Sequence, residues 1–160
     1  MSEALLSPES LAEIDRELAK FPADRRQSAL MAALRIAQDE HGWLSTEMIE
    51  YVAGVIGVPA VRALEVATFY SMYDLQPVGK HKIEVCTNIS CMLRGCDRIT
   101  SHLKDKLGID FGETTEDGKY TLKEVECLAA CAGAPMMQIG HDYYENLTPE
   151  KVDQILEGLE

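Results

Sequence analysis

The chain has 160 residues, of which 46% are hydrophobic and 26% charged, a composition that excludes a disordered or fibrous protein. This length fits one domain or two small ones. Its 15 Lys and Arg against 27 Asp and Glu give a net charge of −12, which disfavours nucleic acid or a membrane surface as a partner.

No stretch approaches the ~20 apolar residues that a membrane-spanning helix needs. The longest candidate, residues 51–61, is interrupted by Gly54, Gly57 and Pro59. Residues 1–11 lack the basic and apolar regions of a secretory signal. We therefore expect a cytoplasmic chain without direct membrane insertion. In that reducing compartment, five cysteines indicate metal or redox chemistry rather than a disulfide framework.

The first half of the chain has four segments with apolar residues at helical spacing. Each begins at a capping residue or a proline, and the first three end at a glycine or beside a proline. The expected helices run from Ser7 to Phe21, from about Asp24 to His41, from Ser45 to Gly57, and from Pro59 to roughly Phe69. Met48, Val52 and Val55 are expected to face inward. These segments predict a small helical bundle over residues 1–75.

The pattern changes after Gln76, where alternating apolar residues indicate strands. Strands are expected at 81–86 and 119–126, with a hairpin over 136–144. A helix that ends at Gly108 carries one apolar stripe, formed by Leu93, Ile99, Leu103 and Leu107. Thr148 and Pro149 begin a last helix. The order β-α-β-β-β-α predicts an α/β layer domain over residues 76–160.

Four of the five cysteines form two short pairs. Cys86 and Cys91 are separated by four residues, Cys127 and Cys131 by three, and 35 residues lie between the pairs. A 2Fe–2S cluster needs four terminal thiolates, two on each tetrahedral iron. Two loops that each present two sulfurs meet this requirement. These four cysteines are therefore candidate ligands of such a cluster.

The sequence around the pairs suits metal binding. Cys86 and Cys127 each lie at the end of a predicted strand. Cys91 is expected to precede a helix, whose N-terminal dipole and free N–H groups favour thiolate over thiol. Small residues of the second loop leave room for backbone N–H groups to approach the sulfurs: Ala129, Ala130, Ala132 and Gly133.

Zinc is the nearest alternative, although structural zinc sites more often use a tight C-x2-C spacing. A third possibility, that the cysteines are small buried hydrophobic residues, suits a single cysteine better than two pairs. It is the interpretation we favour for Cys96. If a helix has begun by Cys91, five residues carry Cys96 about 7.5 Å along its axis and about 140° around it.

Three segments together resemble a known family: CTNISCMLRGC (86–96), ECLAACAGAPMMQI (126–139) and EVATFYSMY (65–73). They are similar to the small 2Fe–2S subunit of the NADH-dehydrogenase module of respiratory complex I, the E-type subunit of NADH:quinone oxidoreductase. The same kind of subunit occurs in NAD-linked hydrogenases and formate dehydrogenases, and the sequence leaves that choice open. The resemblance extends from about Phe21 to Leu156.

The resemblance implies a helical bundle followed by a thioredoxin-like ferredoxin domain. It places a 2Fe–2S cluster on Cys86, Cys91, Cys127 and Cys131, requires no cysteine at position 96, and assigns no catalytic residue to this chain. Four thiolates outweigh the positive charge of the oxidised core, so a low reduction potential is expected. The chain would act as a one-electron carrier.

The sequence contains neither G-x-G-x-x-G nor G-x-x-x-x-G-K-[ST], the glycine-rich motifs that bind nucleotide phosphates. We therefore expect NADH and flavin to bind another polypeptide. The resemblance supplies it as a larger subunit that holds FMN and the NADH site, next to other peripheral-arm subunits. The assembly would be peripheral on the cytoplasmic side of the inner membrane.

A remote alternative is an iron–sulfur redox-sensing helix-turn-helix regulator, suggested by the Ala, Gly and Val spacing between residues 52 and 61. Its recognition helix would offer only Arg62 as a base, which disfavours DNA binding. Five aromatic residues are expected to lie mostly in the core, some of them anchoring a partner: Phe69, Tyr70, Tyr73, Tyr143 and Tyr144.

Overall fold

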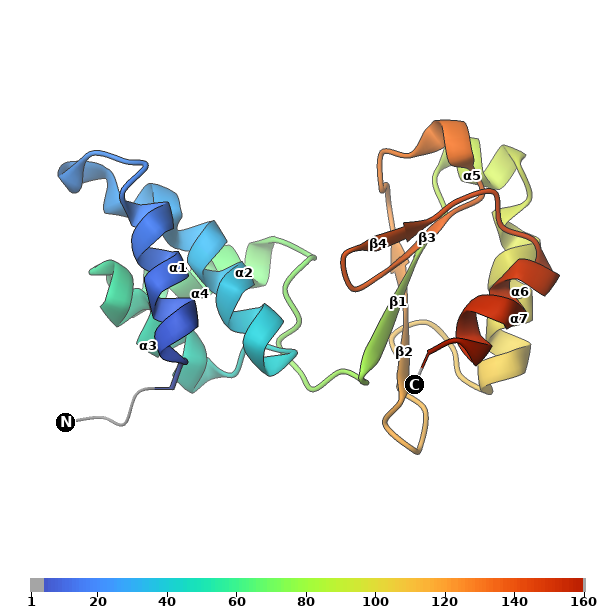
Figure 1. Cartoon of the computed structure of the whole chain (residues 1–160), viewed down its shortest axis with the longest axis horizontal. Coiled ribbons are helices and arrows are strands. Elements are labelled where there is room, and N and C mark those ends of the chain that lie inside the picture. The colour runs from blue at the N-terminus through green and yellow to red at the C-terminus, as the bar shows by residue number, and fades with distance from the viewer. Residues whose placement is uncertain (1–4, 160) are drawn as a thin grey trace. The chain divides into compact units, whose positions relative to one another are not determined.

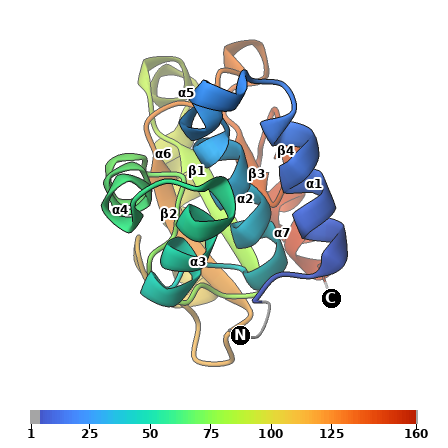
Figure 2. The same cartoon turned by 90° about the vertical axis from the view of Figure 1, so that its left-hand side faces the viewer.

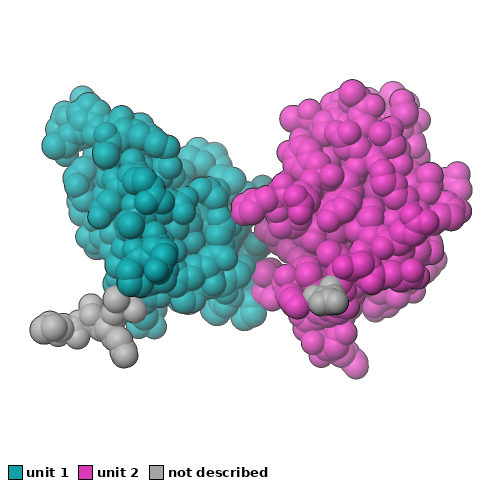
Figure 3. Space-filling model, viewed as in Figure 1, with its two compact units in different colours: residues 1–77 teal, residues 78–160 magenta. Residues whose placement is uncertain are grey.

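The computed structural model describes residues 5–159. Residues 1–4, where the stretch tested for a secretory signal begins, and Glu160 lie outside the described residues. The chain forms two compact units, Met1–Pro77 and Val78–Glu160 (Figure 3). None of the described helices is long and apolar enough to cross a lipid bilayer.

The described part of the first unit is helical (Figure 2). Its elements are α1 (Pro8–Leu18), the 3₁₀ helix η1 (Ala23–Ala29), α2 (Leu30–His41), α3 (Thr46–Ile56) and α4 (Ala60–Phe69). The predicted caps are confirmed: the side chains of Ser7 and Ser45 accept hydrogen bonds from the N–H groups of Ser10 and Met48. Helix α2 contacts α1, α3 and α4, and these helices share one apolar core.

The prediction of one continuous helix from about residue 24 to 41 was wrong in its first part. Arg25 has non-helical angles (φ −121°, ψ 25°), and a 3₁₀ helix precedes α2. The Arg26 guanidinium donates hydrogen bonds to the carbonyl oxygens of Ile56 (2.7 Å) and Val55 (3.2 Å). It thereby satisfies carbonyl groups that the end of α3 leaves without an intrahelical donor. Val55 itself is only partly buried.

Helix α4 packs through small residues rather than through its large apolar ones. Ala63 and Ala67 are buried, whereas Val61, Leu64 and Phe69 are exposed. Helical spacing places Val61 and Leu64, three positions apart, on one face of this helix. It could not show whether another element covers that face.

The expectation that the aromatic residues lie mostly in the core was wrong. Of the five, Tyr73 is buried and Tyr144 partly buried, whereas Phe69, Tyr70 and Tyr143 are exposed. The Tyr73 hydroxyl donates to a backbone carbonyl of α2. Burial raises the pKa of Tyr73 to about 12.

The second unit contains a sheet with the strand order β2-β1-β3-β4. The strands are β1 (His81–Cys86), β2 (Tyr120–Val125), β3 (Met137–Ile139) and β4 (Asp142–Tyr144). Strand β1 runs parallel to β2 and antiparallel to β3, which forms the predicted hairpin with β4. Helices α6 (Cys96–Leu107) and α7 (Pro149–Glu157) lie against the same face of the sheet (Figure 1).

The alternating direction of the side chains along β1 explains this packing. Ile83 and Val85 point into a core that also contains Leu103 of α6 and Val152 of α7. Because β1 and β2 are parallel and in register, their carboxyl ends meet at one edge of the sheet, where Cys86 lies opposite Val125. The residues that follow both strands are thereby brought together.

The apolar stripe predicted from Leu93 onward belongs to two helices. Helix α5 (Ile89–Leu93) ends before Gly95, whose φ of +84° turns the chain, and α6 starts at the next residue. Ile99 and Leu103 are buried as expected, but Leu93 is 77% exposed. Because the helix is interrupted at Gly95, the spacing between Leu93 and the later apolar residues does not predict whether they share a face.

Candidate metal centre

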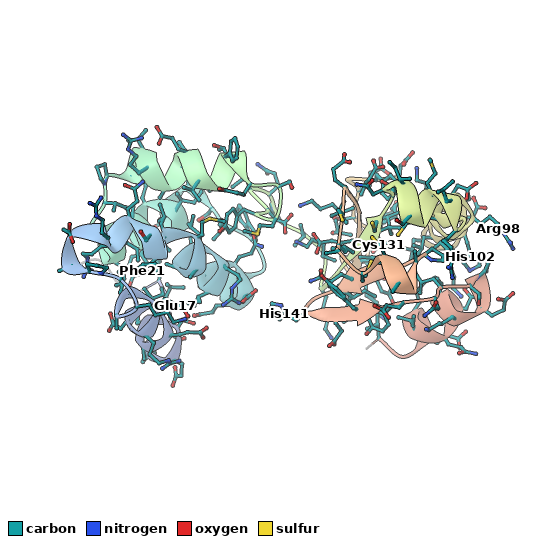
Figure 4. All side chains as sticks on the ribbon, turned by 90° about the horizontal axis from the view of Figure 1, so that it is seen from above. Glu17, Phe21, Arg98, His102, Cys131 and His141 are labelled. Atoms are coloured by element: carbon teal, nitrogen blue, oxygen red, sulfur yellow. The ribbon has the colours of Figure 1, made fainter. Side chains whose placement is uncertain are left out.

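The two cysteine loops meet at the carboxyl ends of β1 and β2. A cavity of about 150 Å³ lies there, lined by residues of α5 and of the loop that follows β2. It is lined by Cys86, Asn88, Ile89, Ser90, Cys91, Cys127, Ala129, Ala130, Cys131 and Met136. Figure 4 shows Cys131 on the side of the second unit away from Arg98 and His102. All four candidate ligands therefore line one cavity.

Cys86 and Cys91 form the buried side of this cavity. Cys86 is the last residue of β1, and Cys91 lies within α5, whose first N–H group is capped by the side chain of Asn88. The prediction that Cys91 precedes a helix was therefore wrong. Burial and the neighbouring Cys86 raise the pKa of Cys91 to about 11. Its proton is favoured until a metal ion replaces it.

Cys127 and Cys131 form the exposed side. Cys127 lies just beyond the end of β2, and Cys131 begins the short 3₁₀ helix η2 (Cys131–Gly133). The prediction that a backbone N–H approaches a sulfur in this loop is confirmed. The N–H of Ala129 donates to Sγ of Cys127 at 3.3 Å. Ala129 adopts a left-handed conformation with φ of +59°, which is uncommon for a residue with a side chain.

Backbone hydrogen bonds hold the second loop in place. The N–H of Cys86 donates to the carbonyl oxygen of Met136 at 3.3 Å, which joins β1 to the residues after η2. The N–H of Asn146 donates to the carbonyl oxygen of Gly133 at 2.6 Å. The second cysteine pair is thus fixed to the sheet and to the segment that follows β4.

The donor set fits a 2Fe–2S cluster. Such a cluster requires four thiolates, and two loops here contribute two cysteines each to the lining of one cavity. An N–H group already points at one of the sulfurs, and hydrogen bonds to sulfur are among the factors that tune the potential of such clusters. Within residues 5–159, no three His, Cys, Asp or Glu side chains stand close enough together to hold a single metal ion.

Cys96 lies in the same buried cluster as Cys86 and Cys91, but not among the residues that line the cavity. The premise that one helix carries it away from Cys91 was wrong, because the chain turns at Gly95. Burial raises the pKa of the Cys96 thiol. Cys96 is therefore a small side chain that packs in this buried cluster.

Sequence reasoning missed the contribution of β4 and the residues after it. The Tyr143 hydroxyl donates to the carbonyl oxygen of Leu128 at 2.9 Å, and the side chain of Glu145 lies against Gly133. The hairpin itself was predicted, which places these residues near the sheet. Local sequence gave no sign that they contact a loop about fifteen positions earlier.

Comparison with known proteins connects this geometry to a family. The model of the thioredoxin-like [2Fe-2S] ferredoxin family matches residues 14–160. The E subunit of NADH-quinone oxidoreductase from Rickettsia bellii (strain RML369-C) is 50% identical over 141 residues, which cover 88% of this chain and 84% of the relative. The E 2 subunit of NADH-quinone oxidoreductase from Rhizobium meliloti (strain 1021) is 48% identical over 147 residues, covering 92% and 86%.

A solved structure shares the fold. An NAD+-reducing [NiFe]-hydrogenase in the air-oxidised state matches with a TM-score of 0.72 and 19% identity, over 87% of this chain. The chain spans about a quarter of that hydrogenase chain, 24% of its length. The expected α/β thioredoxin-like fold is confirmed. The chain belongs to the thioredoxin-like [2Fe-2S] ferredoxin family, together with the E subunits of the NADH-quinone oxidoreductases.

Proposed function

We propose that this chain is a one-electron carrier subunit of an NADH:quinone oxidoreductase. The observation that carries the proposal is an identity of about one half to the E subunits of such enzymes, over most of both chains. The lining of one cavity by both cysteine pairs supports it from the structure. The chain would be active only as part of the complex, and it would contribute no catalytic residue of its own.

Cys86, Cys91, Cys127 and Cys131 are the proposed ligands of a 2Fe–2S cluster. When bound, the cluster supplies one-electron redox chemistry at a low potential. The protein holds the sulfurs on fixed backbone, excludes water from the side of Cys86 and Cys91, and donates the Ala129 N–H to Cys127. Zinc remains an outcome that metal analysis can detect.

The proposed partner is the subunit that holds FMN and the NADH site, within a peripheral arm on the cytoplasmic side of the inner membrane. The surface beside the cavity suits such docking. Ile89, Met92 and Leu93 of α5 are 65%, 56% and 77% exposed, and Cys127 and Cys131 are also exposed. Exposed apolar residues next to a redox centre favour a protein partner there.

An equivalent subunit of an NAD-linked hydrogenase or formate dehydrogenase is the second candidate, because the hydrogenase structure shares the fold over most of this chain. The regulator gains no such support. In a helix-turn-helix regulator, α4 would be the recognition helix. The outer face of α4 presents Val61 and Leu64, and the Arg62 side chain pairs with Glu65 at 2.8 Å. This surface is not suited to phosphate contacts.

The decisive experiment is anaerobic purification of the tagged chain from its own cells, followed by identification of the co-purifying subunits. Quinone oxidoreductase subunits support the proposal, whereas hydrogenase or formate dehydrogenase subunits select the alternative. The isolated chain should contain iron and acid-labile sulfide and should not oxidise NADH. A zinc-loaded, iron-free chain would refute the proposal. Leu93→Asp should weaken binding of the flavin subunit without loss of iron.

A further inference from the structure

One peptide group in the second cysteine loop makes hydrogen bonds at both of its ends. Its carbonyl oxygen, on Leu128, accepts a hydrogen bond from the Tyr143 hydroxyl at 2.9 Å. Its N–H, on Ala129, donates to Sγ of Cys127 at 3.3 Å. The hydroxyl, the peptide and the sulfur therefore form one chain of hydrogen bonds.

This arrangement is held from outside the loop. Tyr143 is the middle residue of β4 and pairs with Gln138 of β3, so the sheet fixes its backbone. Its side chain is 51% exposed, which leaves the hydroxyl contact rather than core packing as its structural role. Ala129 meanwhile has a φ of +59°, a conformation that costs free energy and needs surrounding contacts to persist.

The hydrogen-bond chain has an electrostatic consequence. A donor at the carbonyl oxygen polarises the peptide and strengthens its N–H as a donor. Hydrogen bonds to cluster sulfurs are among the factors that set the reduction potential of an iron–sulfur centre. Since reduction adds negative charge, an N–H directed at a ligand sulfur stabilises the reduced state more than the oxidised state.

We infer that Tyr143 is a positioning residue that raises the reduction potential of the centre through the Leu128–Ala129 peptide. The inference rests on the proposed role of Cys127 as a cluster ligand. Tyr143 does not touch the sulfur itself. It acts by holding the Leu128–Ala129 peptide, whose N–H donates to the sulfur of Cys127.

The test compares Tyr143→Phe with Tyr144→Phe in the full-length chain with its cluster. The first variant removes only the hydroxyl that contacts Leu128, and the second removes the neighbouring hydroxyl on the same strand. EPR-monitored redox titration should give a more negative midpoint potential for Tyr143→Phe. The midpoint potential of Tyr144→Phe should equal that of the unmodified chain.

The outcomes separate this inference from the proposed function. Equal midpoint potentials in all three chains overturn the inference and leave the cluster assignment intact. An unmodified chain without a 2Fe–2S EPR signal overturns both.

A second readout covers the case in which Tyr143→Phe does not retain its cluster. In the cluster-free chain, the Ala129 amide proton should move upfield in the NMR spectrum of Tyr143→Phe, because its hydrogen bond to sulfur weakens. It should keep its position in Tyr144→Phe. An unmoved resonance in Tyr143→Phe overturns the inference.

Discussion

The side chain of Glu145 lies directly against Gly133. A β-carbon added to this glycine would overlap Cδ of the glutamate, lying closer than nonbonded carbon atoms approach. The next residue, Asn146, donates its N–H to the Gly133 carbonyl oxygen. The turn that begins at Cys131 is therefore closed by a contact that only glycine permits.

Gly133→Ala should displace this turn and with it Cys131. The expected cost is about 1–3 kcal/mol of unfolding free energy, as for other overpacked sites, together with lower iron retention. Gly54→Ala is the matched control. Gly54 lies inside α3 with nothing within 4 Å of an added β-carbon, so this change should stabilise the helix by about 0.5–1 kcal/mol. Urea unfolding and iron analysis measure both effects; equal behaviour of the two variants would contradict the prediction.

Serine substitution of the proposed ligands should abolish the centre. Cys86→Ser or Cys127→Ser should lose the cluster or its rhombic EPR signal, because each removes one of four thiolates. Cys96→Ser is the control and should retain the signal, since Cys96 does not line the cavity. Iron content and EPR of the reduced protein measure the result. An unchanged spectrum for Cys127→Ser would remove Cys127 from the ligand set.

Two leucines ten positions apart should respond differently to truncation. Leu103 is fully buried between the sheet and the helices, so Leu103→Ala should cost about 2–5 kcal/mol of unfolding free energy. Leu93 is 77% exposed, and Leu93→Ala should change stability by no more than about 0.5 kcal/mol. Chemical unfolding followed by circular dichroism tests the pair. A large loss of unfolding free energy in Leu93→Ala would mean that other residues cover the Leu93 side chain.

Asp153 of α7 gives the second unit an acid-sensitive contact. Its Oδ1 lies 2.7 Å from Lys106 Nζ and 2.7 Å from His102 Nε2, and these hydrogen bonds, that of Lys106 above all, lower the pKa of Asp153 below its usual value. A lowered folded-state pKa contributes stability that is present above the unfolded pKa of about 3.9 and is lost as the pH falls through the folded value.

Asp153→Asn should therefore lower the urea midpoint slightly at pH 7, and the difference from the unmodified chain should shrink below about pH 4. Asp105→Asn, an exposed change on the same helix as His102 and Lys106, is the control. Urea titrations at several pH values measure the effect. A difference in urea midpoint that grows as the pH falls would contradict the prediction.

Local sequence was sufficient for most of the elements. Capping residues such as Ser7 and Ser45, the glycines that end helices, and the alternation in β1 act over a few residues, so the sequence could place them. The spacing of the cysteine pairs, which fits the four-thiolate requirement of a 2Fe–2S cluster, is also a local property.

What the sequence alone determined was which residues share a strand, a helical face or a short loop. Only the tertiary structure decided which faces are covered, and it left Leu93 and Phe69 exposed. It also decided that the chain turns at Gly95, so that Cys96 joins the buried cluster, and that Tyr143 contacts Leu128. Periodicity repeats within one element, whereas burial and long-range hydrogen bonds depend on the elements that pack against it.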